Sequence, residues 1–134
     1  MSDRTQLMDS TIRALYEVIS FPEGGDPDFQ RMNQVFAPSA RITRVTPEGV
    51  DSFDLPTFQE MVMESLDLGV YTGFHEQEIA RRAEVFGALA HVLSAYETRR
   101  SPNAVGYLAR GVNSIQLLWD GTSWRVLSLL WDEE

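Results

Sequence analysis

Few side chains in this sequence are suited to chemistry, and Arg44 is the first of them. Residues 41–45 alternate polar and apolar side chains, and Arg44 has the parity of Ile42, so it belongs to the apolar face of this segment. A guanidinium stays charged at any accessible pH and binds a carboxylate or phenolate through two parallel hydrogen bonds. Arg44 is therefore a candidate anchor for an anionic ligand. The alternative is a strand-end arginine that reaches solvent or pairs with a neighbouring acid.

The two histidines are candidates for acid–base chemistry, because the charge of histidine changes near neutral pH. His75 stands at the start of a long β-type segment, so it is either an acid–base group or a partly exposed histidine of the sheet. His91 has the parity of the outward residues of its segment, which predicts a contact on the outer face. The remaining charged residues of this region indicate a solvated face: Glu76, Glu78, Glu84, Arg81 and Arg82.

Three tyrosines and one asparagine fall on faces that should be buried. Tyr16 lies on the apolar face of the first helix, Tyr96 on the inward face of a strand, and Tyr107 on the same face as Asn113 in the next strand. Each tyrosine is either a core aromatic whose hydroxyl finds one partner or part of a cavity lining. Asn113 is more informative, because a buried amide must be satisfied by protein, water or ligand.

No pattern in the sequence indicates a metal or a cofactor, and we expect neither. It has no metal-ligand spacing, no glycine-rich phosphate loop and no nucleophile elbow. It has no cysteine, which excludes thiolate chemistry and is compatible with the cytoplasm. A net charge of -9 offers no basic surface to nucleic acid or to an anionic membrane. No segment approaches the ~20 apolar residues of a membrane span.

The elements that must position these residues are helices first and strands second. Apolar residues recur at helical spacing over residues 8–20, Asp26 caps a second helix with Pro27 at its first position, and a third helix opens at Pro56 and ends at Leu68. Residues 41–45 form a short strand, and residues 46–54 form a loop. After Gly73 the pattern is β, over residues 74–86, 90–99, 107–119 and 124–131.

Helices followed by four long antiparallel strands indicate an α+β fold with one domain over residues 1–134. Strands of this length bend or twist strongly, so the sheet should be a curved antiparallel sheet wrapped around about three N-terminal helices. Its inward residues should be Val92, Ser94, Tyr96, Tyr107, Gly111, Asn113, Ile115 and Leu117.

The last strand offers apolar side chains to both of its faces, through Val126, Leu127, Leu129, Leu130 and Trp131. The concave face can pack on the helices, but no further helix remains for the convex face. We therefore expect a two-fold homodimer in which the convex face packs on a second copy of the protein. The alternative is a central strand buried within a monomer.

This order of elements, with the passages FAPSARI and DGTSWRVLSLLW, resembles the nuclear-transport-factor-2-like superfamily. That superfamily has the cone-shaped fold shared by ketosteroid isomerase, the SnoaL-like polyketide cyclases, scytalone dehydratase and limonene-epoxide hydrolase. The resemblance covers nearly the whole chain and implies a cavity between the helices and the concave sheet. It favours Leu127, Leu129 and Trp131 as inward residues, with Trp131 near the cavity mouth. The residues expected to line the pocket are Tyr16, Arg44, Tyr96, Asn113 and Trp131.

The chemistry of these relatives does not transfer to this sequence residue by residue. The general-base position of the isomerase falls on Arg44, a cation that cannot abstract a proton, and its acidic oxyanion donor falls near Asn113 or Ser114. Only its first-helix tyrosine has a counterpart, Tyr16. The carboxylate–arginine–carboxylate set of the epoxide hydrolase is not recognisable. The paired histidines of the dehydratase are not matched either, because His75 and His91 have different faces.

Two functions therefore stay open, since the fold alone is silent on chemistry. The first is a cofactor-independent lyase, isomerase or hydrolase that acts on a small hydrophobic molecule, anionic where Arg44 sets the preference. The second is a non-catalytic ligand-binding or protein-interaction module that uses the same cavity or the convex sheet.

Overall fold

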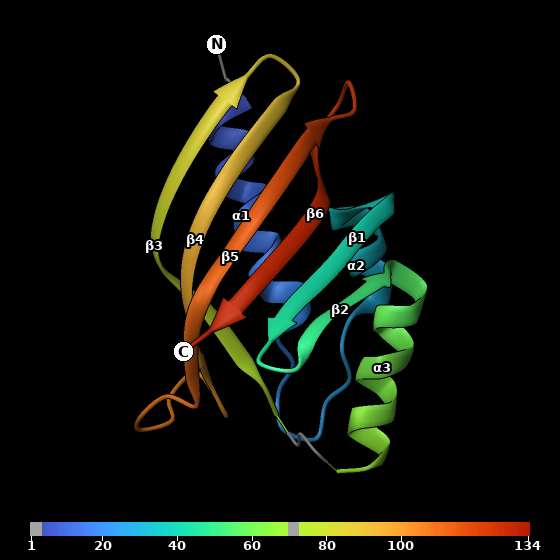
Figure 1. Ribbon diagram of the computed structural model, residues 1–134, viewed down its shortest axis with the longest axis vertical. Coiled ribbons are helices and arrows are strands. Elements are labelled where there is room, and N and C mark those ends of the chain that lie inside the picture. The colour runs from blue at the N-terminus through green and yellow to red at the C-terminus, as the bar shows by residue number, and fades with distance from the viewer. Residues whose placement is uncertain (1–3, 70–72) are drawn as a thin grey trace.

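The computed structural model describes residues 4–69 and 73–134, which form three helices and a six-stranded curved sheet (Figure 1). The helices are α1 (Arg4–Ile19), α2 (Phe29–Val35) and α3 (Leu55–Asp67). The strands are β1 (Phe36–Thr46), β2 (Gly49–Asp54), β3 (His75–Phe86), β4 (Leu89–Arg99), β5 (Ala109–Trp119) and β6 (Trp124–Glu133). The α+β class and the curved sheet predicted from the sequence are confirmed.

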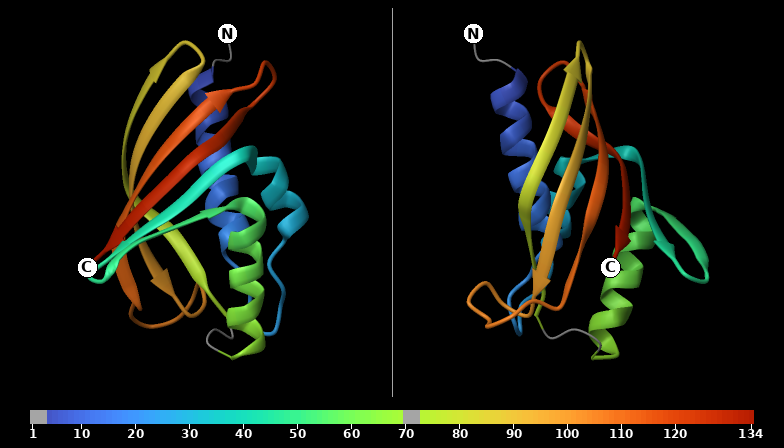
Figure 2. Two further views of the ribbon diagram at one scale, coloured as in Figure 1. Left: turned by 45° about the vertical axis from the view of Figure 1, so that its right-hand side comes forward. Right: turned by 60° about the vertical axis from the view of Figure 1, so that its left-hand side comes forward.

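The sheet has the order β2-β1-β6-β5-β4-β3, so β2 and β3 are its two edges. Neighbouring strands are antiparallel except β1 and β6, which are parallel. Helix α1 runs across the concave face, α2 lies next to it, and α3 packs beside β1 and β2 (Figure 2). The concave face is therefore the one that holds the core.

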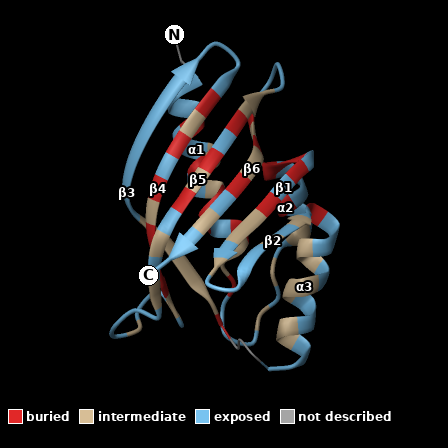
Figure 3. Cartoon of the chain, viewed as in Figure 1, coloured by how far each residue is buried: buried red, intermediate tan, exposed pale blue. Residues whose placement is uncertain are grey.

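The core forms where the apolar stripe of α1 meets the inward residues of the central strands. Met8, Ile12 and Leu15 are buried, and the strands that oppose them alternate buried and accessible residues (Figure 3). The inward residues predicted for β4 and most of those for β5 are confirmed, because Val92, Ser94, Tyr96, Asn113, Ile115 and Leu117 are all buried. Tyr107 is an exception: it precedes β5, is 47% exposed, and packs its ring against the Arg110 guanidinium.

A β-bulge explains much of the apolar excess of β6. Val126 pairs with Leu117 and Ser128 with Gln116, so Leu127 has no partner residue in β5. The extra residue restores the inward parity, and Val126 and Leu129 are both buried although they are three positions apart. Leu127 thus occupies the bulge rather than the inward row with Leu129, which corrects the expectation from the sequence.

The region before α3 contains a strand that the sequence pattern did not predict. Residues 49–54, expected as loop, form β2, an edge strand paired with β1 from Arg41↔Asp54 to Thr46↔Gly49. Its side chains are half-buried or exposed, so hydrophobic alternation gave no signal. Helix α3 begins directly after it, where the Asp54 carboxylate accepts a hydrogen bond from the Thr57 backbone N–H at 2.9 Å.

Within the described part of the chain, no helix is long and apolar enough to cross a membrane.

Candidate functional site

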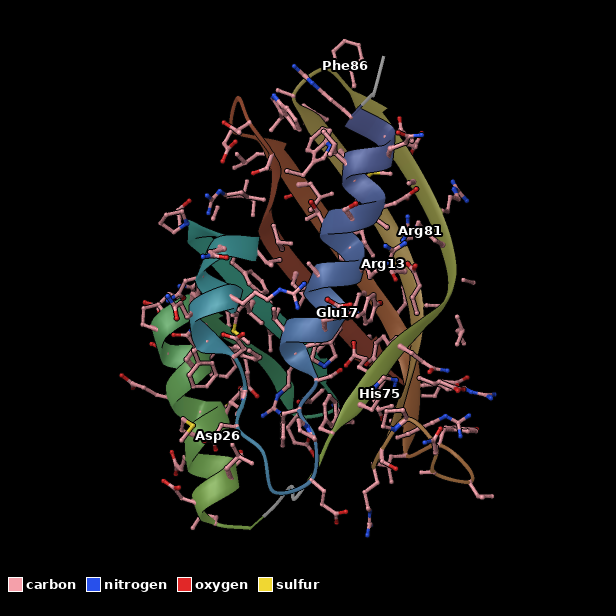
Figure 4. The ribbon with its side chains drawn as sticks, turned by 180° about the vertical axis from the view of Figure 1, so that it is seen from behind. Arg13, Glu17, Asp26, His75, Arg81 and Phe86 are labelled. Carbon is pink, nitrogen blue, oxygen red and sulfur yellow. The ribbon has the colours of Figure 1, made fainter. Side chains whose placement is uncertain are left out.

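A cleft of about 740 Å³ lies between α1 and the edge strand β3. Its walls come from α1, the segment that follows it and the first half of β3. Phe21 and Phe74 line one end, with ring centroids 6.3 Å apart and reciprocal backbone hydrogen bonds. Figure 4 shows Arg13 and Glu17 of α1 on one side of this region and His75 and Arg81 of β3 on the other. The surface of the cleft is mostly apolar by area, although most of its lining residues carry a polar or ionisable side chain.

A bulge in β3 decides which charged residues face the cleft. Glu78 pairs with Tyr96 and Ala80 pairs with Ala95, so Ile79 has no partner and the parity of the strand changes there. As a result Glu78 and Arg81 share the concave side, although they are three residues apart. The charged face predicted from the sequence is therefore split. Arg81, Arg82 and Glu84 are exposed, as expected, whereas Glu76 and Glu78 are half-buried. Arg81 nevertheless lines the cleft together with Glu76 and Glu78.

Tyr16 begins a chain of short hydrogen bonds that ends on an ion pair. Its hydroxyl lies 2.6 Å from Ser94 Oγ, which donates to Oε2 of Glu78 at 2.5 Å. Nε and Nη2 of Arg81 hold the Glu78 carboxylate, and Nη1 of Arg81 also contacts Asp9. Ser94 has one hydroxyl proton and Glu78 takes it. Tyr16 must therefore be the donor to Ser94.

Asn113 connects this chain to a second carboxyl group. Its Nδ2 donates to the Tyr16 hydroxyl oxygen at 3.0 Å and to Oε2 of Glu76 at 3.1 Å. Both protons of the amide nitrogen are then used, so Asn113 holds Glu76 and Tyr16 at fixed positions. The amide nitrogen of Asn113 thus has both of its partners within the protein, and no fully buried side-chain nitrogen or oxygen of the described residues lacks a partner.

Glu76 is the carboxyl group of this network whose pKa is raised. Burial raises the pKa of Glu76 to about 7, the Asn113 hydrogen bond opposes the rise, and the nearby Glu133 carboxylate adds to it. Among the described residues no cation pairs with Glu76. Burial also raises the pKa of Tyr16 to about 12, so its phenol stays protonated at neutral pH.

A second tyrosine–carboxylate pair stands beside the first. The Tyr96 hydroxyl donates to Oε2 of Glu133 at 2.8 Å, and burial raises the pKa of Tyr96. The ring passes over Gly111, where a Cβ would lie 2.7 Å from the Tyr96 hydroxyl oxygen and 2.4 Å from the Asp132 carbonyl oxygen. Glycine at this position therefore leaves the space that the tyrosine occupies.

The structure separates the five residues that the sequence placed in one pocket. Tyr16 lines the cleft, Asn113 supports it from the sheet, and Tyr96 is buried behind it. Trp131 is half-buried against the core and pairs with Asn113 in the β5–β6 register. Arg44 lies on β1, with its side chain 42% exposed and its Nε 3.0 Å from Oδ2 of Asp51.

Arg44 therefore has the protein acid that the alternative interpretation required, and it does not line the cleft. His75 lines the cleft, with its Nε2 3.3 Å from Oε1 of Gln77. His91 has the outward parity expected of it, and its Nε2 lies 2.9 Å from Oγ of Ser114. In the described ranges, 4–69 and 73–134, no group of three or more histidines and acids could hold a metal ion.

Glu76, Glu78 and Arg81 are the residues of this site that sequence analysis missed. Ser94 was placed inward correctly, but its neighbours across the strand pair were assigned to solvent. They were assigned to a solvated face because they are charged, and the bulge at Ile79, which brings Arg81 to the side of Glu78, has no proline or glycine to mark it.

The arrangement can exchange a proton with a bound molecule. A carboxyl with a pKa of about 7 is present in both forms at neutral pH, so it can accept a proton and return it. Asn113 orients this carboxyl, and Tyr16 is held in its neutral form beside it.

Comparison with known proteins gives structural relatives only. No protein-family profile matches the chain, and no curated protein is similar to it in sequence. A protein of unknown function with a cystatin-like fold from Nostoc punctiforme superposes with a TM-score of 0.75 at 9% identity, over 97% of this chain and 90% of that chain. A nuclear-transport-factor-2-like superfamily protein from Salmonella enterica gives 0.69 at 14% identity, over 98% and 93%.

A third relative is a nuclear-transport-factor-2-like protein of unknown function from Shewanella baltica, with a TM-score of 0.66 at 16% identity over 100% of this chain and 98% of that chain. Identities this low establish the fold and say nothing of the reaction. The resemblance inferred from the sequence is thus confirmed at the level of structure: the chain has the cone fold of the nuclear-transport-factor-2-like proteins.

Proposed function

We propose that this protein binds a small hydrophobic molecule in the cleft between α1 and β3 and exchanges a proton with it through Glu76. One observation carries the proposal: a carboxyl group with a pKa of about 7 lines an apolar cleft and is held by an asparagine that also holds a neutral tyrosine. Perturbed titratable groups in a cleft are typical of functional sites.

The reaction class that these groups fit is isomerisation or elimination. The Glu76 carboxylate takes a proton from a C–H bond of the ligand, and the electron pair of that bond moves into the ligand. In an isomerisation the resulting carboxylic acid returns the proton to another carbon, so the ligand keeps its composition. In an elimination the proton goes to the departing hydroxide and water leaves. Both sequences balance with groups of this chain and the ligand alone.

Deuterium exchange in D2O tests the proposal and separates the enzyme from a non-catalytic binding module. Hydrophobic probes with an acidic C–H bond are screened by ¹H–¹⁵N NMR for shifts in α1 and β3, and probes that bind are followed for loss of the C–H signal. We expect exchange with wild type and at least a tenfold slower rate with Glu76→Gln. Binding at the cleft without exchange would assign the protein to the binding modules. Shifts confined to the convex sheet would refute the site itself.

We also propose that the protein is a homodimer and that it is located in the cytoplasm. The convex face carries exposed apolar side chains, including Leu93, Val112 and Leu130 at 39%, 44% and 40% exposure, and these support a homodimer through that face. A cytoplasmic location is supported by the sequence, which contains no cysteine.

A further inference from the structure

We propose that the ligand of the cleft carries a cationic end, as a hydrophobic amine does, and that this end binds at Glu76. This inference rests on the binding part of the proposed function and names the chemical class that the same site takes, with Glu76 as the anchor of the ligand rather than its base. Glu76 is the acid of the cleft that has neither an ion pair nor a hydrogen bond from a charged donor within the described part of the chain. The aromatic end formed by Phe21 and Phe74 lines the same cleft and offers an apolar surface to the rest of such a ligand.

The other acids of the cleft are already paired. Arg81 holds both Glu78 and Asp9, and Arg31 holds Glu17 at 2.6 Å. Among the described acids that line the cleft, the carboxyl of Glu76 is therefore the one that forms no ion pair with an arginine and can bind a cation. Ionised Glu76 also lies near the Glu133 carboxylate, which makes its own negative charge less favourable until a cation arrives.

Arg13 is the feature that could favour an anion instead. It lines the cleft from α1, and no ion pair within the described ranges includes it. However, Arg13 is an exposed residue, so water and salt weaken its attraction for a ligand. Glu76 lies in a less polar environment where the same charge interacts more strongly. The deeper group should therefore set the charge preference.

Binding of a cation should also release a proton. The groups that face Glu76 are Tyr16 from α1, Asn113 from β5, Glu133 from β6 and Tyr96 from β4, with Glu78 on its own strand; none of them is a cation. A bound ammonium group would be the first cation beside Glu76 and would favour its carboxylate form. Below neutral pH the bound carboxyl must then give up its proton to the buffer.

Three probes with one aromatic ring system and different charges test the inference: tryptamine, tryptophol and indole-3-acetate. Isothermal titration is run at about pH 6 and about pH 8 in two buffers of different ionisation enthalpy, and ¹H–¹⁵N NMR maps each probe. We expect tryptamine to bind in the cleft at least about tenfold more tightly than tryptophol at pH 8. Its binding should release a substantial fraction of one proton at pH 6 and much less at pH 8.

Matched variants identify the carboxyl responsible. Glu76→Gln should bind tryptamine and tryptophol equally, and Glu76→Asp, which keeps the charge, should retain the preference. Glu84→Gln removes an exposed carboxyl of the same strand that does not line the cleft, so it should leave the preference unchanged.

Three results would overturn the inference: equal affinities for tryptamine and tryptophol, no binding of tryptamine, or tighter binding of indole-3-acetate that is lost in Arg13→Ala. In the first and third cases the probes still occupy the cleft, so the proposed binding function survives. Probes that shift only residues outside α1 and β3 would count against both.

Discussion

The direction of the Tyr16 hydrogen bond follows from counting protons, and it makes this hydroxyl a structural as well as a chemical group. Tyr16 donates to Ser94 and accepts from Asn113, so both neighbours depend on it. Removing the hydroxyl leaves a donor of a buried amide without its acceptor. A buried polar group left unpaired costs more than the net contribution of the bond it lost.

Replacement of Tyr16 by phenylalanine should therefore lower the free energy of unfolding by about 1–3 kcal/mol, because the Asn113 amide keeps its burial and loses a partner. Urea denaturation measures the change. Tyr107→Phe is the matched control: that side chain is 47% exposed, and its substitution should change stability by less than about 0.5 kcal/mol. Equal effects of the two substitutions would mean that the hydroxyl chain contributes nothing to folding.

Glu76 gives the stability of the protein a pH dependence whose sign can be worked out. Its pKa rises from 4.5 to about 7 on folding, so the folded state binds the proton more tightly than the unfolded state does. Folding is therefore favoured below pH 4.5, and this contribution is lost as pH rises to about 7.

We expect Glu76→Gln to remove this loss, so the stability of the variant relative to wild type should increase between pH 4.5 and about 7 and then level off. The full increase is at most about 3 kcal/mol, from the size of the pKa change. Urea unfolding of both proteins across this range measures it. A difference that does not change with pH would show that the Glu76 carboxyl is as well solvated in the folded state as in the unfolded one.

At the scale of elements, the sequence predicted the helices and strands whose apolar residues recur at regular spacing. It missed the bulges and the edge strand, where that spacing is broken or absent. The stripe of α1 and the start of α3 at Pro56 follow from spacing and from the proline, and both occur to within a residue. The cap predicted at Asp26 is wrong, because Asp28 caps α2. The inward residues of β4 follow from alternation. Edge strand β2 has no buried stripe, so alternation could not reveal it.

The candidate site was less predictable than the fold for a related reason. Tyr16, Ser94 and Asn113 were found because each stands on a regular face. Glu76, Glu78 and Arg81 were assigned to a solvated face because they are charged. The unpaired residue Ile79 then places Arg81 on the same side as Glu78, which the sequence pattern did not indicate. Arg44 shares the apolar parity of its strand, yet the missed β2 supplies Asp51 as its partner. The surroundings of these residues depend on which strands pair with each other and in which register. The spacing of residues along the sequence does not reveal that pairing.

Substitution of Gly111 tests whether β4, β5 and β6 must approach closely at the site. An alanine Cβ there would lie 2.4 Å from the Asp132 carbonyl oxygen of β6 and 2.7 Å from the Tyr96 hydroxyl oxygen of β4. The backbone atom cannot move without disturbing the β5–β6 pairing, so Gly111→Ala should destabilise the protein by about 1–3 kcal/mol.

Ser114→Ala, on the outward face of the same strand, is the control and should cost clearly less. Thermal unfolding with a two-state fit measures both. If Gly111→Ala is as stable as wild type, the three strands must be able to separate at this point without loss. The position of Tyr96 against Glu133 would then not depend on the close approach of these strands.

At the scale of the whole molecule, the curved sheet gives the protein two unlike faces. The helices lie on the concave face (Figure 2), and the core and the cleft lie between the helices and the sheet. The convex face has no helix over it among the described residues, and its central strands carry apolar side chains between polar ones such as His91, Ser114 and Gln116. A net charge of -9 keeps copies of the protein apart in general, so association must use a surface with little charge.

We expect the convex face of the sheet to form a dimer interface. Leu93, Val112 and Leu130 come from three adjacent strands, share the outward parity and are each about 40% exposed in the single chain. A two-fold packing of convex faces would bury them together, and a standard interface covers roughly 800 Å² on each partner. Sedimentation velocity at tens of micromolar should therefore show a dimer for wild type and a folded monomer for Leu130→Glu, because a carboxylate would be desolvated without a partner. Val105→Glu is the control, since this fully accessible residue lies in the connection before β5 and should leave the dimer intact. A dimer that survives Leu130→Glu unchanged would place the interface elsewhere. A wild-type monomer would show that the convex apolar residues stay exposed to solvent.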